Sequence, residues 1–490
     1  MDAMGRLFHD RWPTAAAFYA ERDHRTELEV QQLHRYACAP IEIHVEPECA
    51  GDVTIQRMAI LVANLTARWA RNIRVFVPNV CLAPQLQVFG EQTLSERIAR
   101  EMREADPFGN FTVGVGVDSD LCSIRLWVGI YNTSAHPHTK DDYAIDATEW
   151  TVLGRREPSG DCRLIRNATV GAAALAAAIG AADVFKRAIG HDRSDWFGNI
   201  DWCTWDHVFG AKRGVRSGPS LPDCFDVGKI LIAGVGAVGS AVLYILGMTS
   251  IYGEITLLDM DRIEASNLNR SPLFSAEDAL RAFEKTEVGR RFLARLGCEA
   301  RVVNGPWHQH CRTLGEERFD VWISLTNERG AWAEVPFQLP PVVLHGTTTS
   351  GWGVAAGRHL PRIEDCTACR LPRPSTEFRG PCAEGELPAV QDHAPMRAAL
   401  PFLSTVSAAL IVSELAKLQF AEAGTLPNAI CADFRKGLPA VIAQTLGLNP
   451  NCPGCQLTLL PEWMKRGGRS RYAGLSKAAA VDMHCAGCVT

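Results

Sequence analysis

The stretch KILIAGVGAVGS, residues 229–240, decides the fold of this chain. Its apolar run, residues 230–232, predicts a buried strand. The run leads into a turn with three glycines and then into a helical pattern; the glycines are Gly234, Gly236 and Gly239. Glycines at these positions permit a tight turn and close backbone approach, so a phosphate can bind the amides and the positive end of the helix dipole. The stretch therefore predicts a nucleotide site in an α/β fold.

Polar and charged side chains follow the next predicted strand, EITLLDMD. They are Asp259, Asp261, Asn267, Asn269, Arg270 and, further on, Lys285. Nicotinamide and flavin domains also place an acidic residue where Asp259 stands. A dinucleotide site needs no such group of cationic and amide side chains beside its phosphates, whereas a triphosphate does. The pattern therefore favours ATP as the ligand.

This region resembles the adenylating domain of the ubiquitin-activating-enzyme superfamily, which includes the bacterial ThiF and MoeB proteins. Those proteins carry a similar glycine turn, a DxD strand end, an SNLxRQ segment and a lysine in a KxEV-like context. Here the segment reads SNLNR and Ser271 replaces the glutamine. The resemblance implies that Asp259 binds ribose. It also implies that the ATP phosphates are bound by Asn267, Arg270 and Lys285.

Magnesium binding departs from the family pattern. The resembled proteins usually have an acidic TDN at a later strand end, and this chain has Thr326, Asn327 and Glu328 there. Asn327 is included in the expected ATP site, although its amide offers an oxygen without charge. The ion would then depend on a carboxylate of Asp259, Asp261 or Glu328.

Length and composition predict a soluble globular protein more than a nucleic-acid or membrane protein. At 490 residues the chain predicts two domains. The net charge of −5 gives no excess of positive charge for binding nucleic acid. The longest apolar run, residues 170–185, is shorter than a membrane-spanning helix. Seventeen cysteines without an export signal predict a reducing compartment, so we expect a cytoplasmic protein.

The first part of the chain repeats the strand, helix and strand order without the glycines. IEIHV and NIRVFVP predict parallel strands, but EPECAGD stands where a phosphate loop would fall. The resemblance implies a degenerate adenylation copy at residues 1–190, a linker at 191–228 and the active domain at 229–490. The expected architecture is two Rossmann-like, doubly wound ThiF-type domains that form a pseudo-dimer within one chain. The alternative is an unrelated α/β domain stacked on the active one.

Three CxxC pairs occur in the C-terminal part of the chain. Two pairs can supply four thiolates to a tetrahedral zinc ion, and the family joins the pairs matching CTAC and NPNCPGC into one structural site. The expected ligands are Cys366, Cys369, Cys452 and Cys455. The third pair, Cys485 and Cys488, lies at the end of the chain and has no assigned role.

Cys382 stands alone in PCAEGELP. In the resembled family a cysteine in this loop accepts the activated acyl group as a thioester or takes part in sulfur transfer. We therefore expect Cys382 to be catalytic together with Arg270 and Lys285. The alternative is an ordinary loop cysteine.

The resemblance implies ATP-dependent adenylation of the C-terminal carboxylate of a ubiquitin-like β-grasp protein. Transfer to Cys382 and hand-over to a ubiquitin-conjugating-type enzyme would follow, as in bacterial conjugation operons associated with antiviral defence. Three alternatives stay open. They are activation of a sulfur-carrier protein for cofactor synthesis, adenylation of a small molecule or tRNA base, and a non-catalytic nucleotide-binding scaffold.

Overall fold

The computed structural model describes residues 3–115, 123–129, 141–156, 167–209, 218–221, 224–326, 328, 330–349, 352–370 and 399–475. Within these ranges, no helix combines the length and the apolar character needed to cross a membrane.

The C-terminal half is built on a mixed sheet of eight strands. They are β8 (Cys224–Ala233), β9 (Ser250–Asp259), β10 (Glu299–Asn304), β11 (Val321–Ser324), β12 (Val342–Thr348), β13 (Gly353–His359), β14 (Ala429–Asp433) and β15 (Ala440–Gln444). The strand order is β10-β9-β8-β11-β12-β13-β14-β15, parallel from β10 to β12 and antiparallel beyond it. The glycine stretch therefore follows a central parallel strand, as the sequence predicts.

Both faces of β8 are buried. Ile230 and Ile232 point into the main core, whereas Leu231 joins a second cluster with Trp307 and Trp322 on the opposite face. A strand covered on both faces needs a continuous apolar run, which explains why residues 230–232 show no alternation. The prediction of a doubly wound sheet is confirmed.

The N-terminal half contains a sheet of seven strands with the same arrangement. They are β1 (Ile41–Val45), β2 (Asn72–Phe76), β3 (Asn110–Gly114), β4 (Ile124–Val128), β5 (Tyr143–Thr148), β6 (Thr151–Arg155) and β7 (Ile200–Cys203). The order is β3-β2-β1-β4-β5-β6-β7, parallel from β3 to β5 and antiparallel in β6 and β7. The predicted parallel pairing of IEIHV with NIRVFVP is confirmed.

Helices connect and cover the strands. In the N-terminal half they are α1 (Ala3–Arg11), α2 (Ala15–Arg22), α3 (His24–Glu27), α4 (Leu33–Tyr36), α5 (Val53–Ala67), η1 (Pro84–Leu86), α6 (Leu94–Ala105), α7 (Val170–Ala188) and η2 (Arg193–Asp195). In the C-terminal half they are α8 (Ala237–Leu246), α9 (Ala265–Leu268), α10 (Ala276–Leu280), α11 (Lys285–Arg295), α12 (Trp307–Glu316), α13 (Ala331–Glu334), η3 (Val335–Gln338), α14 (Thr367–Arg370), α15 (Leu403–Lys417), η4 (Ala421–Thr425), α16 (Pro453–Leu457), α17 (Pro461–Lys465) and η5 (Gly467–Arg469).

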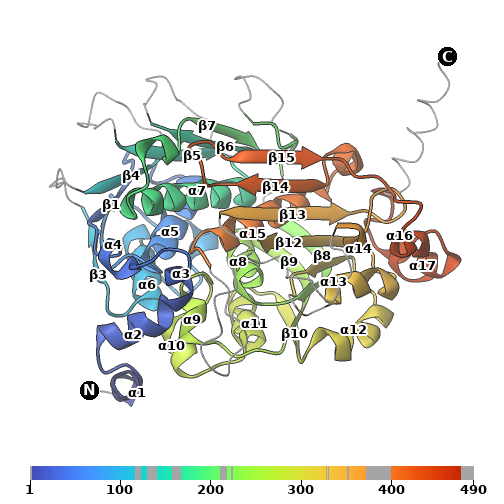
Figure 1. The fold of residues 1–490 in the computed structure, drawn as a ribbon, viewed down its shortest axis with the longest axis horizontal. Helices are drawn as coiled ribbons and strands as arrows, with labels where there is room; N and C mark the ends of the chain where they lie inside the picture. Colours follow the sequence, from blue (N-terminus) through green and yellow to red (C-terminus); the bar gives the residue numbers. More distant parts are fainter. Residues whose placement is uncertain are drawn as a thin grey trace.

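The two halves share the order of their first seven strands, with β15 added in the C-terminal half, and meet through helices at equivalent positions. Helix α5 follows β1 as α8 follows β8, and α7 follows β6 as α15 follows β13. Helices α7 and α15 pack against each other, and Figure 1 shows the antiparallel strands β6, β7, β14 and β15 gathered on one side above them. The contacts are reciprocal. Lys186 of α7 donates to the Lys436 carbonyl at 2.9 Å, and Lys417 of α15 lies 2.9 Å from Nε2 of His207.

The segment 191–228, expected to be a linker, contributes to both sheets. Strand β7 pairs with β6 and belongs to the first sheet, and β8 begins at Cys224, before residue 229. The side chain of Trp202 in β7 is fully buried, and Trp205 is nearly so. A strand of four residues is too short to show a readable period among the surrounding glycines and prolines, which is why the sequence pattern indicated a linker.

Candidate functional site

The loop after β8 uses its three glycines for different purposes. Gly234 has φ +98°, and a Cβ there would lie 2.7 Å from the Thr326 amide nitrogen. A Cβ on Gly239 would lie 2.1 Å from the Gly234 carbonyl oxygen, because α8 packs directly on the loop. At Gly236, the N-cap of α8, no described atom lies within 4 Å of the Cβ position. The room for a ligand is therefore at Gly236, beside the amide end of α8.

Asp259, the last residue of β9, lies directly beside this loop. Its Oδ2 accepts a hydrogen bond from the Val235 amide at 2.7 Å, and its Oδ1 accepts one from the Asp261 amide at 2.9 Å. Burial raises the pKa of Asp259 above its ordinary value, and the nearby Lys285 opposes that shift. The carboxylate is thus fixed at the strand end where a ribose-binding residue is expected.

Lys285 and Asp261 are brought together across this strand end. Lys285 is the first residue of α11, and its Nζ lies 2.7 Å from Oδ2 of Asp261. The lysine side chain is 8 % exposed and the aspartate side chain 54 %. The lysine is therefore held by a carboxylate that remains open to solvent.

Asn267 and Arg270 lie on the short helix α9 and the turn that follows it. Oδ1 of Asn267 accepts from the Glu264 amide at 3.0 Å and so caps α9. Arg270 is buried, and its Nη1 donates to the Ser266 carbonyl and, at 2.8 Å, to Oδ1 of Asn269. Asn269 thereby orients the Arg270 guanidinium.

The charge of Arg270 is not neutralised by a neighbouring carboxylate. Burial, together with Arg25, lowers the pKa of Arg270 well below its ordinary value, and Glu264 opposes the shift only as the weakest of the three influences. Among the described residues, no carboxylate forms an ion pair with it. A buried guanidinium that has no ion-pair partner among the described residues favours a bound anion.

The N-terminal half contributes residues that the sequence analysis missed. Arg25 and Thr26 lie on α3, and Oγ1 of Thr26 accepts from Nδ2 of Asn269 at 2.7 Å. Thr26 and Asn269 are separated by 243 positions in the sequence. Neither carries a sequence signal, because α3 is a single polar turn with no motif.

Some expected site residues lie outside the described ranges. These are Asn327 and Cys382; the unassigned pair Cys485 and Cys488 also lies outside them. Glu328 is described, and its Oε1 accepts from the Trp307 amide at 2.6 Å at the start of α12. Asp259 and Glu328 both accept hydrogen bonds from backbone amides, whereas Asp261 pairs with Lys285.

The two CxxC pairs of the predicted zinc site do come together. Their ligand atoms all lie within 4.8 Å of one another; the residues are Cys366, Cys369, Cys452 and Cys455. Three of the Sγ–Sγ distances are 3.9, 3.7 and 3.5 Å. Four thiolates about 2.3 Å from one zinc ion would lie about 3.8 Å apart, so the cluster fits this metal.

Burial and the neighbouring sulfurs support the same assignment. They raise the pKa of Cys366 and bring that of Cys455 to about 12. Thiols in such a cluster do not ionise together unless a cation balances them. The geometry and the charge requirement therefore both suit a structural metal ion between α14 and α16.

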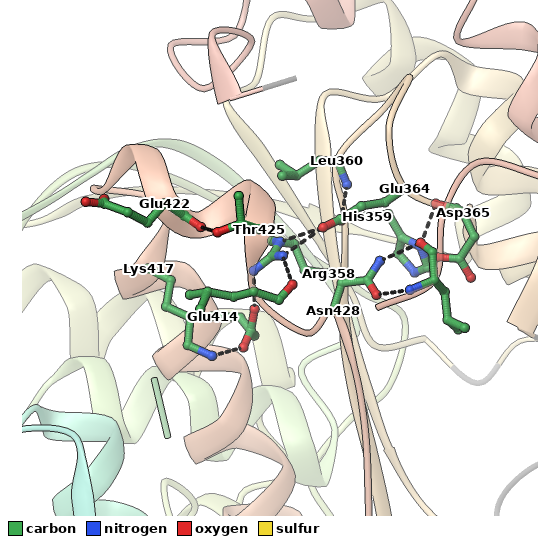
Figure 2. A network of polar contacts seen from close by, with 12 residues as sticks. Arg358, His359, Leu360, Glu364, Asp365, Glu414, Lys417, Glu422, Thr425 and Asn428 are labelled. Atoms are coloured by element: carbon green, nitrogen blue, oxygen red, sulfur yellow. Dashed lines mark hydrogen bonds and ion pairs between the residues drawn. The ribbon is translucent and has the colours of Figure 1, made fainter. Parts of the chain in front are cut away.

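A buried polar network fixes the strand that leads to the cysteine cluster. Figure 2 shows Arg358 of β13 between Glu364 and Glu414, at 2.7 and 2.8 Å. Glu414 of α15 also pairs with Lys417, and its Oε1 lies 3.1 Å from Nε2 of His207. All these side chains are almost fully buried, so the network joins the sheet, α15 and the N-terminal half in one arrangement.

Comparison with known proteins gives the family. Residues 223–321 match the family model described as ThiF. The sulfur carrier protein adenylyltransferase of Thermus thermophilus is 26 % identical over 252 residues, which cover 49 % of this chain and 86 % of that protein. The NEDD8-activating enzyme E1 catalytic subunit of Caenorhabditis elegans is 34 % identical over 89 residues, which cover 18 % of this chain and only 20 % of that subunit.

A solved structure of E. coli MccB with MccA-N7isoASN has a TM-score of 0.37 and 20 % identity, and the match covers 46 % of this chain and 66 % of that one. The glycine loop, Asp259 and Lys285 all lie within the range that the family model matches. Residues 223–321 are therefore a ThiF family domain, which places the chain in the ThiF, MoeB and ubiquitin-activating superfamily of adenylating proteins.

Proposed function

We propose that this chain uses ATP to adenylate the C-terminal carboxylate of a ubiquitin-like protein and then carries the acyl group on Cys382. A ubiquitin-conjugating-type enzyme would receive it, in a cytoplasmic bacterial conjugation system of the kind associated with antiviral defence. The relatives named as activating enzyme and as adenylyltransferase support the first step. The later steps rest on the PCAEGELP resemblance.

One observation carries the proposal. The open position at Gly236, the carboxylate of Asp259, and the cations Lys285 and Arg270 all follow the carboxyl ends of the adjacent parallel strands β8 and β9. Ligands of open parallel sheets bind at this end of the strands. Arg25, from the other half, adds a third cation whose charge acts on Arg270. Such a concentration of donors and positive charge suits a triphosphate better than a dinucleotide.

The reaction would proceed in two steps. A carboxylate oxygen of the partner attacks the α-phosphorus, the bond to the β-phosphate oxygen breaks, and pyrophosphate leaves with the electron pair. Lys285 and Arg270 would stabilise the charge that grows on the leaving group. Magnesium, shared with Asp261, would neutralise the phosphates when bound. The Cys382 thiolate then attacks the acyl carbon, AMP leaves, and a thioester forms.

The N-terminal half would be the degenerate copy of the pair. Its strand order and helix positions parallel those of the C-terminal half. At the position of the glycine loop, Asp52 caps α5 and accepts from the Thr54 amide at 2.7 Å. A carboxylate at that helix start would repel phosphate. The proposed boundaries place this copy before the ThiF domain, with β7 included in it.

Titration of the purified protein with ATP and with NAD tests the nucleotide assignment. We expect ATP to bind and NAD not to compete. Exchange of labelled pyrophosphate into ATP, in the presence of a candidate ubiquitin-like protein, tests the chemistry. Absence of ATP binding, or tighter binding of NAD, would refute the adenylation proposal.

Activation of a sulfur-carrier protein is the second candidate function. It is favoured by the match that covers 86 % of the Thermus thermophilus sulfur carrier protein adenylyltransferase. The first half-reaction is the same, so the candidates differ in the fate of the acyl adenylate. Formation of a thioester adduct with Cys382 that a thiol reductant removes would favour conjugation, whereas release of a partner thiocarboxylate when a sulfur donor is supplied would favour sulfur transfer.

A further inference from the structure

The turn that carries Arg270 is held in place by hydrogen bonds from the N-terminal half of the chain. Arg68, at the C-cap of α5, is 1 % exposed and lies under this turn. It donates to the carbonyls of Leu268 at 2.6 Å, Pro272 at 2.7 Å and Phe274 at 3.2 Å. One guanidinium thus holds three carbonyls within seven residues, which suits the planar fork of arginine and no other side chain.

The carbonyl of Arg270, between Leu268 and Pro272 in the same turn, is held by a residue of α15. Oγ of Ser404, in α15, donates to the Arg270 carbonyl at 2.6 Å. The carbonyls of residues 268, 270, 272 and 274 are therefore all fixed, three of them by Arg68. Arg68 itself is oriented by Oδ1 of Asn64, which accepts from its Nε at 2.7 Å.

A second contact from the N-terminal half controls the Arg270 side chain. Thr26 accepts from Nδ2 of Asn269 at 2.7 Å and donates to the Ala399 carbonyl at 3.0 Å. Oδ1 of the same asparagine accepts from Arg270 at 2.8 Å. The threonine fixes which way the amide points, and the amide fixes the guanidinium.

We propose that Arg68 and Thr26 are positioning residues of the nucleotide site, so that the N-terminal half sets the geometry of Arg270. Arg68 fixes the backbone of the turn, and Thr26 fixes the side chain through Asn269. The inference rests on the proposed function, because Arg270 is taken to contact the ATP phosphates. It goes beyond that function by assigning an active-site task to the half that carries no glycine loop.

Two pairs of variants test the proposal. Thr26→Val keeps the shape of the side chain but cannot accept from Asn269, whereas Thr26→Ser keeps the hydroxyl. Arg68→Lys keeps the charge but loses the fork. Its control is Arg57→Lys, because Arg57 is also buried on α5 and donates across the interface to the Met248 carbonyl at 2.8 Å, away from the turn.

The measurements are the thermal midpoint and the affinities for ATP and for adenosine, which lacks phosphates. We expect Thr26→Val and Arg68→Lys to weaken ATP binding by about tenfold and to leave adenosine binding unchanged. Thr26→Ser should restore ATP binding. Arg57→Lys should lower the thermal midpoint but keep the ratio of the two affinities.

Two results would overturn the inference. If Thr26→Val and Arg68→Lys bind ATP as the parent does, or lose ATP and adenosine in parallel, their role is structural only. Should Arg68→Lys fail to fold, the Thr26→Val and Thr26→Ser pair alone decides the question. A parent protein that does not bind ATP at all would instead refute the proposed function, and the two failures are therefore distinguishable.

Discussion

Two glycines of the same loop should respond in opposite ways to the same substitution. Gly239→Ala would place a methyl group 2.1 Å from the Gly234 carbonyl oxygen, a backbone atom that cannot move without opening the strand, turn and helix unit. Overpacking of this kind costs about 1–3 kcal/mol or more, so we expect a clearly lowered thermal midpoint. Gly236→Ala would add a methyl group where no described atom lies within 4 Å. Its cost to folding should stay below about 1 kcal/mol, the range of an N-cap substitution.

The effects on nucleotide binding should be reversed. A phosphate that accepts from the amides near Gly236 would meet the new methyl group, and we expect ATP affinity to fall at least tenfold, or about 1.4 kcal/mol. Calorimetric titration with ATP, beside thermal unfolding of each variant, checks both expectations. Parental ATP affinity in Gly236→Ala would show that phosphate does not approach this loop. Parental stability in Gly239→Ala would show that the close packing of α8 is unimportant.

Three further predictions concern chemistry, metal and pH. Arg270→Ala or Lys285→Ala should abolish partner-dependent exchange of pyrophosphate into ATP, whereas Cys382→Ala should keep the exchange and lose the reducible adduct; an adduct that persists would place the acceptor elsewhere. Cys366→Ser should lose the single zinc ion measured by metal analysis and lower the thermal midpoint, and full zinc retention would contradict the four-cysteine site. Burial lowers the pKa of His207 to about 4, so the folded chain resists a proton that the unfolded chain binds below about 6.5. Stability should therefore fall as the pH is lowered from about 6.5 to about 4, by up to about 3 kcal/mol, and His207→Gln should flatten that slope in thermal unfolding.

The pH prediction depends on all groups that face His207. Lys417 disfavours its protonation, whereas Glu414 and Asp206 favour it. The pKa of Glu414 is itself lowered by Lys417 and Arg358 against its burial, so its contribution to stability is also lost in acid. Both groups therefore act in the same direction but in different pH ranges, because Glu414 loses its contribution only below its ordinary pKa of about 4.5. An unchanged slope between about pH 6.5 and about 4 in His207→Gln would therefore refute the assignment to His207.

The nucleotide domain was readable because its signals are local. A strand, three glycines and a helix occupy residues 229–246, and Gly234 and Gly239 each have a steric reason in the structure. The expected pairing of CTAC with NPNCPGC is also found in the structure, since four thiols in two short turns are a common ligand set for one zinc ion. The roles of Asn327 and Cys382 stay predictions, because both lie outside the described residues.

The domain boundaries and the residues that position the site could not be predicted from local sequence patterns. Strand β7 was assigned to a linker because four residues give too short a pattern, and only its pairing with β6 identifies it. Asn269 was noticed as a polar residue near the phosphates, whereas its two contacts show that it orients Arg270.

By itself, the sequence determined the α/β class, the glycine loop and the four cysteines that form one cluster, because these depend on short motifs whose residues are close together in the chain. The tertiary structure alone decided that Arg25, Thr26 and Arg68 belong to the neighbourhood of Arg270. It also decided that His207 meets Glu414 across 207 residues. Contacts at such separations depend on how two sheets pack through α7 and α15, and no local propensity encodes that arrangement.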